Sequence, residues 1–306
     1  MTRRGWLLFA AMSAIWGIPY LLIKIAVGEL APATLVLGRT GLAALLLLPI
    51  ALTRGAVRPV LRRWRMVLLF TAVEICVPWL ALGYAEQRLS SSLTGLLIAG
   101  VPLMSAVLAV FGARGEPLGA RRLVGLLTGL AGVGALVGFE VGGGDLRAVA
   151  ALAAVIVAYA LGALVLGRGL GDLPGVGVIA VSLTVAAVAF LPAGLVQAPR
   201  HWPSAAALTS VIVLAVVCTA VAFLVFFELV GEVGPARSTV ITYVNPAVAV
   251  LLGVLILHER FGVATAVGFA LILGGSVLAT VRTRAAVPAG VTGATVNAVA
   301  AERSTT

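Results

Sequence analysis

The sequence predicts an all-α integral membrane protein with ten transmembrane helices arranged as two inverted repeats of five. The first observation is composition: 61% of the 306 residues are hydrophobic and only 10% are charged, and the mean hydropathy is +1.17. A soluble globule of this size needs more polar surface than such a chain provides. The second observation is a series of long apolar runs. The third is that residues of the first half of the sequence recur in the same order in the second half.

Ten apolar runs, separated by charged residues or by Pro and Gly, are long enough to cross the hydrocarbon layer, which takes roughly 20 helical residues. Lipid leaves unpaired backbone groups without a partner, so each run is expected to be a helix. The runs do not alternate apolar with polar residues, which argues against a β-barrel. Their ranges are 6–27, 33–52, 66–85, 91–111, 122–139, 148–167, 175–196, 205–229, 238–257 and 262–281.

The distribution of charge predicts the orientation. The chain carries 21 Lys and Arg residues and a net charge of +10. With both termini in the cytoplasm, most of these cations fall in cytoplasmic segments, as the positive-inside rule requires. The first run is long enough to span and is followed by nine others, so it is expected to stay as a helix rather than to be cleaved as a signal peptide. These features predict a multi-pass protein of a bacterial-type plasma (inner) membrane, and they do not favour nucleic acid as a partner.

An internal duplication is visible when the sequence is shifted by 143 or 144 positions. Trp16 then falls on Tyr159, and Pro102 falls on Pro246. Glu116 falls on Glu259, and each of them follows the span that contains its proline, Pro102 or Pro246. Ordered matches at a nearly constant offset indicate two related halves.

The two halves are expected at residues 1–140 and 147–284, followed by a disordered tail at 285–306. Because five spans is an odd number, the second half enters the bilayer from the opposite side, which makes an inverted repeat. Carriers commonly use this arrangement, since one packing geometry can then face either side. A duplication that merely enlarged the bundle is the alternative.

Short motifs occur in both halves of the sequence. They are Ala14-Ile15-Trp16-Gly17, Lys24, Pro32, Arg39, Pro102, Glu116, Arg121–Gly125, Asn245-Pro246, His258-Glu259-Arg260 and Gly268. These motifs resemble the EamA-type repeat of the drug/metabolite transporter superfamily. The resemblance implies ten helices in two inverted halves and export of small metabolites such as amino acids, or of drugs. The halves differ in two respects, because Ser182 aligns with Arg39 and Gly167 or Arg168 aligns with Lys24.

Glu74 is the candidate for proton coupling. It lies near the middle of the third span, and no other charged residue occurs between Arg65 and Glu86. An ionisable group inside a span is costly unless it is paired or hydrated, so it is a functional candidate by default. A structural Glu bonded to a neighbouring helix remains the alternative.

Trp16, Tyr20 and Lys24 occur at every fourth position and share one helix face about 80° wide. An aromatic face ending in a cation suits a substrate with a carboxylate or an aromatic group. Packing, with Lys24 reaching the outer headgroups, is the competing interpretation. For Arg39 three roles stay open: binding an anion, pairing with Glu74, or reaching the headgroups.

The ninth span places Ser238, Thr242 and Asn245 on one face, where they suit a hydrated pathway or interhelical hydrogen bonds. Packing is favoured for Ser238 and a cavity role for Asn245. Proline within a helix frees a carbonyl and bends the helix, so Pro102 and Pro246 are candidate bend residues beside a midplane site. Further lining candidates are Trp79, Tyr84, Tyr159 and Tyr243.

Glycine pairs four residues apart predict close helix packing in the fifth span, at Gly125/Gly129 and Gly134/Gly138, and glycines recur in the tenth span at Gly268, Gly274 and Gly275.

The chemistry expected is transport rather than catalysis. The two His and two Cys residues are too scattered for a metal site, and no nucleotide-binding motif occurs. We therefore expect no cofactor and a secondary transporter that exports a small metabolite by alternating access, with or without proton coupling. Its partners are the small-molecule substrate and membrane lipid. A lipid flippase or a membrane-embedded enzyme using the same cavity is the alternative, and a passive facilitator is a third option.

Overall fold

The computed structural model describes residues 2–111, 119–138, 145–234, 238 and 240–280, and every regular element in these ranges is a helix. Eight helical stretches among them are long and apolar enough to cross a membrane. The expected fifth and ninth spans contain α9 (Ala120–Leu136) and α15 (Ile241–Leu257), each of 17 residues. The predicted all-helical membrane fold is confirmed. The joint between the halves and the C-terminal tail lie largely or wholly outside the described residues.

Several spans of the first half are interrupted. The first is divided before Pro19, because proline lacks the N–H that a continuous helix would use. The third contains a π-helical segment, and the fourth is broken just before Pro102. In chain order the elements are α1 (Arg3–Gly17), α2 (Pro19–Ala26), α3 (Pro32–Thr53), α4 (Val57–Leu61), α5 (Trp64–Thr71), η1 (Ala72–Cys76), α6 (Val77–Glu86), α7 (Ser91–Ile98), α8 (Val101–Phe111) and α9.

The second half repeats this order. Its eighth span contains a π-helical segment, as the third does, whereas the ninth runs through Pro246 as one helix. The elements are α10 (Leu146–Val165), η3 (Leu166–Leu170), α11 (Gly175–Val196), α12 (Ala205–Ala215), η4 (Val216–Val221), α13 (Ala222–Val233), α15 and α16 (Val263–Thr280).

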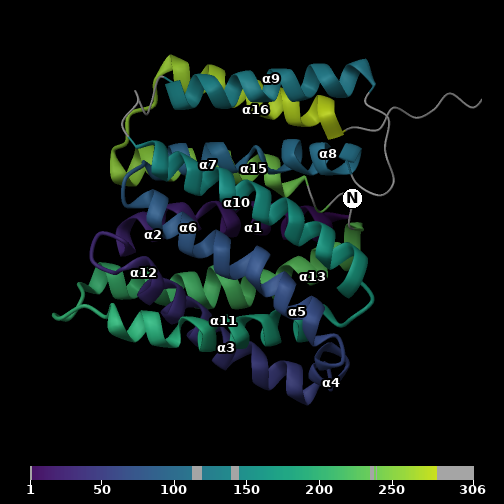
Figure 1. Ribbon diagram of the computed structural model, residues 1–306, viewed down its shortest axis with the longest axis vertical. Helices are drawn as coiled ribbons and strands as arrows, with labels where there is room; N and C mark the ends of the chain where they lie inside the picture. The colour runs from purple at the N-terminus through teal and green to yellow at the C-terminus, as the bar shows by residue number, and fades with distance from the viewer. Residues whose placement is uncertain (1, 112–118, 139–144, 235–237, 239, 281–306) are drawn as a thin grey trace, which may run out of the picture.

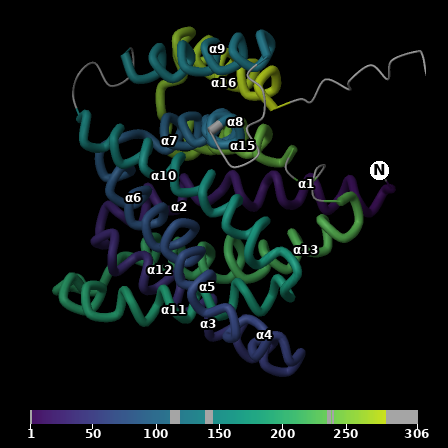
Figure 2. The backbone as a smooth tube through the Cα atoms, turned by 45° about the vertical axis from the view of Figure 1, so that its right-hand side comes forward, coloured from purple at the N-terminus to yellow at the C-terminus, as the bar shows by residue number. Residues whose placement is uncertain are grey.

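Helices at equivalent positions of the two halves pack against each other. The fifth and tenth spans, α9 and α16, form one end of the molecule, and the second and seventh, α3 and α11, lie together near the other (Figure 1). The fourth and ninth, α7 and α15, are also in contact. The tube view in Figure 2 gives the same grouping. Packing of this kind is expected when a twofold axis relates the halves.

Glycines bring α9 and α16 close together. A Cβ on Gly125 would meet the backbone of Gly275 and Ala279, and one on Gly132 would meet the backbone of Gly268. The small residues therefore permit direct backbone contact, as predicted from their spacing. The prediction does not extend to every glycine, since nothing lies within 4 Å of a Cβ at Gly134, Gly138 or Gly274.

Large apolar side chains cover the outside of the bundle. Leu45 is 73% exposed, and Leu130 and Val188 are also exposed. Such surfaces are unfavourable in water but match the hydrocarbon of a bilayer. Charged side chains inside this bundle are therefore the features that need an explanation.

Candidate functional site

Two π-helical segments occupy equivalent places in the third and eighth spans. The first, η1, begins at Ala72, and η4 begins at Val216, a separation of 144 positions. Glu74 lies on η1 and Thr219 on η4. Single-turn π segments inside α-helices are frequent at functional sites, so their recurrence draws attention to the space between these spans.

Arg39 lies in the interior of the bundle, on α3. It is only 7% exposed. Its Nε donates to Thr219 Oγ1 at 2.9 Å, and the guanidinium carbon lies 3.6 Å from the centroid of the Trp79 ring. Thr219 Oγ1 donates in turn to the carbonyl of Leu214 at 2.7 Å. Arg39 is thus held between α3, α6 and η4, and its guanidinium lies in the bundle interior rather than at the headgroups.

Polar and aromatic residues from both halves surround Arg39. Tyr20 of α2, Tyr159 of α10 and Glu86 of α6 are close enough to interact with it electrostatically. Tyr159 also interacts with Glu74 and contacts Trp79. We call Tyr20, Arg39, Trp79, Tyr159 and Thr219 the central cluster. Four of these five were predicted from the sequence as lining residues, and the structure brings them together.

Glu74 adjoins the central cluster through Tyr159. It is partly buried, and its carboxylate lies against Gly162 of α10, where a Cβ would overlap it. The three ion pairs that described residues form do not include Glu74 or Arg39. The expected option of an Arg39–Glu74 pair is therefore absent from the described part of this structure.

Lys24 binds main-chain carbonyls, a role different from the substrate binding or headgroup contact predicted from the sequence. Its Nζ donates to the main-chain carbonyls of Glu86 at 2.6 Å and Leu89 at 2.8 Å. Glu86 is the last residue of α6 and Leu89 lies in the turn that follows, so Lys24 caps the end of α6 from α2. Helix capping is neither headgroup contact nor substrate binding, and whether Lys24 also meets a substrate stays a prediction.

Glu86 was missed by sequence reasoning. It is 0% exposed, and neither carboxylate oxygen has a hydrogen-bond partner among the residues that the structure describes. It lies at the end of the third span beside Gln87 and Arg88, and this polar sequence context carries no signal that Glu86 is buried.

The remaining predicted lining residues lie outside the central cluster. Trp16 packs against Phe223 and Phe226, with ring centroids 5.8 and 5.0 Å apart. Tyr84 lies under the Arg88 guanidinium at 4.2 Å. Tyr243 shares a 2.9 Å hydrogen bond with Thr280, on α16.

Asn245 links two helices. When the side-chain amide is oriented with its nitrogen toward two nearby carbonyls, it donates to Ser13 at 3.1 Å and to Ile241 at 2.9 Å. This contact joins α15 to α1, and the cavity role of Asn245 stays a prediction. Thr242 lies one turn before Pro246 on the same helix.

Carboxylates hold helix ends on both faces of the bundle. Glu29, in the loop after α2, accepts from the Ser204 N–H at 2.6 Å and from its hydroxyl. Asp172, in the loop after η3, accepts from two nitrogens of Arg63 at 2.6 and 2.8 Å. These hydrogen bonds, from the Ser204 hydroxyl and from Arg63 respectively, lower the pKa of each carboxyl.

Glu259 caps α7 across the halves. Its two oxygens accept from the N–H groups of Ser91 and Ser92 at 2.8 and 2.9 Å, and from both hydroxyls. Partial burial alone would raise the pKa of Glu259, but these hydrogen bonds outweigh it and lower the pKa. The repeat partner, Glu116, lies outside the described residues.

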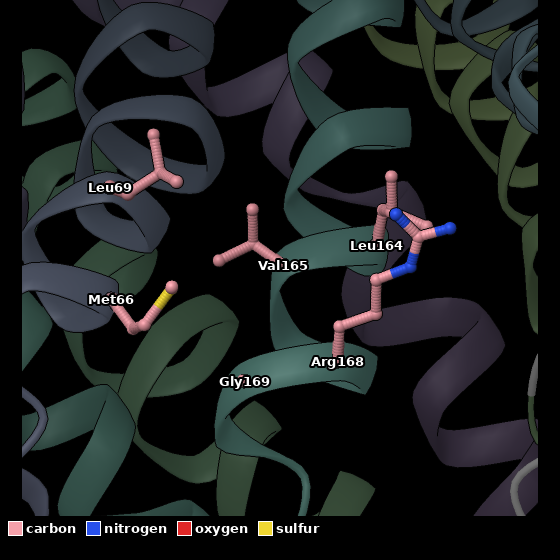
Figure 3. Close-up of a pocket in the computed structure, with 6 residues that line it drawn as sticks. All are labelled: Met66, Leu69, Leu164, Val165, Arg168 and Gly169. Carbon is pink, nitrogen blue, oxygen red and sulfur yellow. The ribbon is translucent and has the colours of Figure 1, made fainter. Parts of the chain in front are cut away.

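An apolar groove of about 210 Å³ lies apart from the central cluster, between α5 and the end of the sixth span. Figure 3 shows Met66 and Leu69 on one side and Val165 opposite them, with the Arg168 guanidinium beside Leu164 and away from Met66 and Leu69. None of the predicted site residues lines it. Across the described ranges, no group of three or more His, Cys, Asp or Glu side chains is placed to hold a metal ion.

A helical bundle with an apolar exterior that encloses a charged and aromatic cluster between two related halves is typical of membrane transport proteins. The chain belongs to the EamA-like transporter family, which matches residues 3–138 and again 146–281. The double match agrees with the duplication inferred from the sequence.

Curated relatives carry transporter names. The chain is 26% identical over 288 residues to the uncharacterized transporter YvbV of Bacillus subtilis, covering 91% of this chain and 92% of YvbV. It is 31% identical over 259 residues to the uncharacterized inner membrane transporter YedA of Escherichia coli K12, covering 80% of this chain and 81% of YedA. A solved crystal structure matches 92% of this chain and 97% of its own, with a TM-score of 0.65 and 23% identity, which supports the fold.

Proposed function

We propose that this protein is a secondary transporter that exports a small amino acid-like or drug-like metabolite across the inner membrane by alternating access. The observation that carries the proposal is the central cluster: a buried Arg39, held by Trp79 and Thr219, inside a bundle whose exterior is apolar. A buried charge is expensive in a membrane, and substrate pathways are where membrane proteins retain one.

The cluster is assembled from both halves. Tyr20, Arg39 and Trp79 belong to the first half, whereas Tyr159 and Thr219 belong to the second. Movement of one half against the other would therefore change the contacts around a substrate. A transporter of this kind works because its substrate binds two conformations and links their interconversion to movement across the membrane.

Glu74 is proposed as the proton site. It lies in the third span beside Tyr159, which also interacts with Arg39. A change in the charge of Glu74 would therefore change the electrostatic potential at the central cluster. Exchange of the exported substrate for an entering proton is part of this proposal. Both termini are placed in the cytoplasm because that orientation keeps most of the Lys and Arg residues inside.

The test is reconstitution in liposomes with a panel of small metabolites and an imposed pH gradient. We expect accumulation of at least one compound driven by the gradient and abolished by an uncoupler. Glu74→Gln is expected to remove the response to the gradient, while the control Glu228→Gln, an exposed carboxyl that pairs with Arg4, is expected to keep it. Absence of movement for every compound would refute the transporter, and an unchanged pH response in Glu74→Gln would refute the coupling.

The groove in Figure 3 favours one second candidate, a lipid flippase. Its lining is mostly apolar and includes one cation, Arg168, a combination suited to an acyl chain and an anionic headgroup. The same liposomes, loaded with a fluorescent phosphatidylglycerol, distinguish the two activities. Movement of the lipid but of none of the water-soluble compounds would favour the flippase.

A further inference from the structure

We infer that Glu86 takes up a proton from the outer side when the two halves close at that end of the bundle, and releases it there when they separate. The closing step therefore depends on the pH outside. The inference rests on the proposed function for its two conformations and for its orientation in the membrane. It concerns a different carboxyl from Glu74, at the end of the third span rather than near its middle.

The carboxyl of Glu86 is enclosed without a hydrogen bond. Its side chain is 0% exposed, and neither oxygen has a partner among the residues that the structure describes. The main chain of Lys24 approaches the carboxyl without forming a hydrogen bond to it. An ionised carboxylate held away from water without such bonds is so unfavourable that the group takes up a proton instead. Glu86 is therefore neutral in this conformation.

The contacts of Lys24 give an independent reason for a neutral Glu86. The Lys24 Nζ donates to the main-chain carbonyls of Glu86 at 2.6 Å and Leu89 at 2.8 Å. The ion pairs within the described part of the chain do not join Lys24 to the Glu86 carboxyl. An ionised carboxyl on the same residue would attract the ammonium more strongly than its carbonyl does, because opposite full charges interact strongly away from water. The preference of Lys24 for the carbonyls indicates that the side chain carries no charge.

The ionisable groups that act on Glu86 come from three other elements. Lys24 and Tyr20 belong to α2, Arg39 to α3, and Glu259 to the loop after α15. The two cations attract an ionised Glu86, and Glu259 repels it. Neither cation is in direct ion-pair contact with Glu86 in the described ranges. Their attraction therefore does not replace the water that burial removes.

The remaining elements packed on α6 direct their ionisable groups elsewhere. The sequence of α7 contains none. Glu74 of η1 and Tyr159 of α10 interact with each other, and Glu74 lies about three helical turns before Glu86. Asp145, which precedes α10, pairs with Arg88 at 2.8 Å.

Both halves take part in the enclosure of Glu86. The turn after Glu86 leads into α7, whose first N–H groups, at Ser91 and Ser92, are bound by Glu259 of the second half. The second half also supplies α10, which packs against α6. The charge distribution places this end of the bundle on the outer side. Separation of the halves there would admit water to Glu86, and the carboxyl would ionise and release its proton.

The proton state is tested by infrared spectroscopy on the purified full-length protein between about pH 5.5 and about pH 8, where exposed carboxyls are ionised. A protonated carboxyl gives a C=O stretching band of its own. We expect Glu86→Gln to remove one such band and Asp145→Asn to remove none. Asp145 is the matched control, because it is ion-paired at the same end and Asn also serves as an N-cap for α10. If Glu86→Gln removes no band at any of these pH values, the inference is overturned.

The link to closure is tested by thiol labelling from outside, in proteoliposomes with equal pH on both sides and no substrate. The reporter is Thr94→Cys on α7, a position that is 0% exposed, in a Cys76→Ala, Cys218→Ala background. Its rate is divided at each pH by that of Trp202→Cys, which is 93% exposed, because the thiolate fraction itself changes with pH.

Uptake of one proton on closure changes the ratio of closed to open molecules by at most about tenfold per pH unit. We therefore expect labelling in the otherwise unchanged Glu86 protein to slow by up to about this factor as the pH falls. Glu86→Gln, whose neutral amide resembles the protonated acid, should label slowly at every pH, and Asp145→Asn should keep the pH dependence. The same pH dependence with and without Glu86→Gln contradicts the inference.

A second variant and the transport assay complete the test. If Glu86→Gln does not elute as a single species, Glu86→Asp should shift both the infrared band and the pH at which labelling slows, and no shift in either overturns the inference. Labelling that depends on pH through Glu86, without transport of any compound, would leave the inference standing and refute the transporter. Transport that Glu74→Gln uncouples, with no infrared band assigned to Glu86, would do the reverse.

Discussion

Glu29 and Asp172 occupy equivalent positions in the two halves, 143 residues apart, and each binds the residue that precedes a membrane helix of the opposite half. Ser204, the partner of Glu29, is the N-cap of α12, and Arg63, the partner of Asp172, precedes α5. In an inverted repeat these contacts lie on opposite faces of the membrane. They are therefore candidates for contacts that hold the two halves together on either face of the membrane. We call the Glu29–Ser204 contact the outer latch and the Asp172–Arg63 contact the inner latch.

Weakening the two latches should have opposite effects on access to the interior. Cys218, which is 1% exposed and adjoins Thr219, is the reporter in a Cys76→Ala background. We expect Glu29→Gln to speed its labelling by a membrane-impermeant thiol reagent from the outside, and Asp172→Asn from the inside. The change should be at most about fivefold, because exposed pairs contribute little.

Partner variants provide the control for this experiment. Ser204→Ala should reproduce Glu29→Gln, and Arg63→Gln should reproduce Asp172→Asn, because each removes the other member of one latch. An increase from the same side for both latches would contradict the opposite placement.

Glu259→Gln should destabilise the protein by removing the negative charge that caps α7. A capping interaction of this kind contributes about 1 kcal/mol, and partial exposure of the carboxyl argues for no more. Because the folded state lowers the pKa of Glu259, the stabilisation is present above the ordinary carboxyl pKa of about 4.3 and is lost as pH falls through the lowered value.

Thermal unfolding in detergent at several pH values tests this dependence. The difference in Tm between wild type and Glu259→Gln should be constant from about pH 8 to about pH 5 and shrink below about pH 4. If the difference in Tm between wild type and Glu259→Gln grows as the pH falls, it contradicts a lowered pKa of Glu259 in the folded state.

Lys24→Met should lower stability, because it leaves the carbonyls of Glu86 and Leu89 without their donor. Loss of hydrogen bonds from a charged donor to buried carbonyls costs about 1–3 kcal/mol. Thermal unfolding and substrate efflux are measured on the same preparation, with Lys24→Arg as the charge-preserving control. Efflux lost with Tm unchanged would instead support the sequence-based hypothesis that Lys24 binds substrate.

Much of the fold follows from local sequence features. The apolar runs predict the spans because hydrocarbon thickness sets their length, and the offset that joins Pro102 to Pro246 predicts the repeat. The π-helical segments η1 and η4 were not predicted. Pro78 follows η1 and has no N–H to donate to the Glu74 carbonyl four residues earlier, so it is a local signal for a disturbed turn at η1. No Pro or Gly lies within η4, so the extra residue in its turn depends on tertiary packing.

The candidate site was less accessible to sequence reasoning. Helix periodicity places Trp16 on the same face as Tyr20, but the division of the span at Pro19 gives the two residues different neighbours. The same limit applies to Arg39. Its distance from the span end left three roles open, and the choice depends on Trp79 and Thr219, which reach it only in the folded bundle.

Gly162 should be necessary for the position of Glu74. A Cβ at residue 162 would overlap the Glu74 carboxylate, so Gly162→Ala must displace that side chain or separate η1 from α10. Overpacking at a well-packed contact costs about 1–3 kcal/mol, of which the gain in helix propensity from Gly to Ala returns up to about 1 kcal/mol.

Gly167→Ala is the matched control, because a Cβ there has nothing within 4 Å. It lies on the same transmembrane segment and should leave both Tm and transport close to wild type. We expect Gly162→Ala to lower transport and to alter its pH dependence, since the displaced residue is the proposed proton site. If Gly162→Ala lowers Tm but leaves the pH dependence of transport unchanged, the contact between Gly162 and Glu74 serves packing alone, and the coupling role of Glu74 loses its structural support.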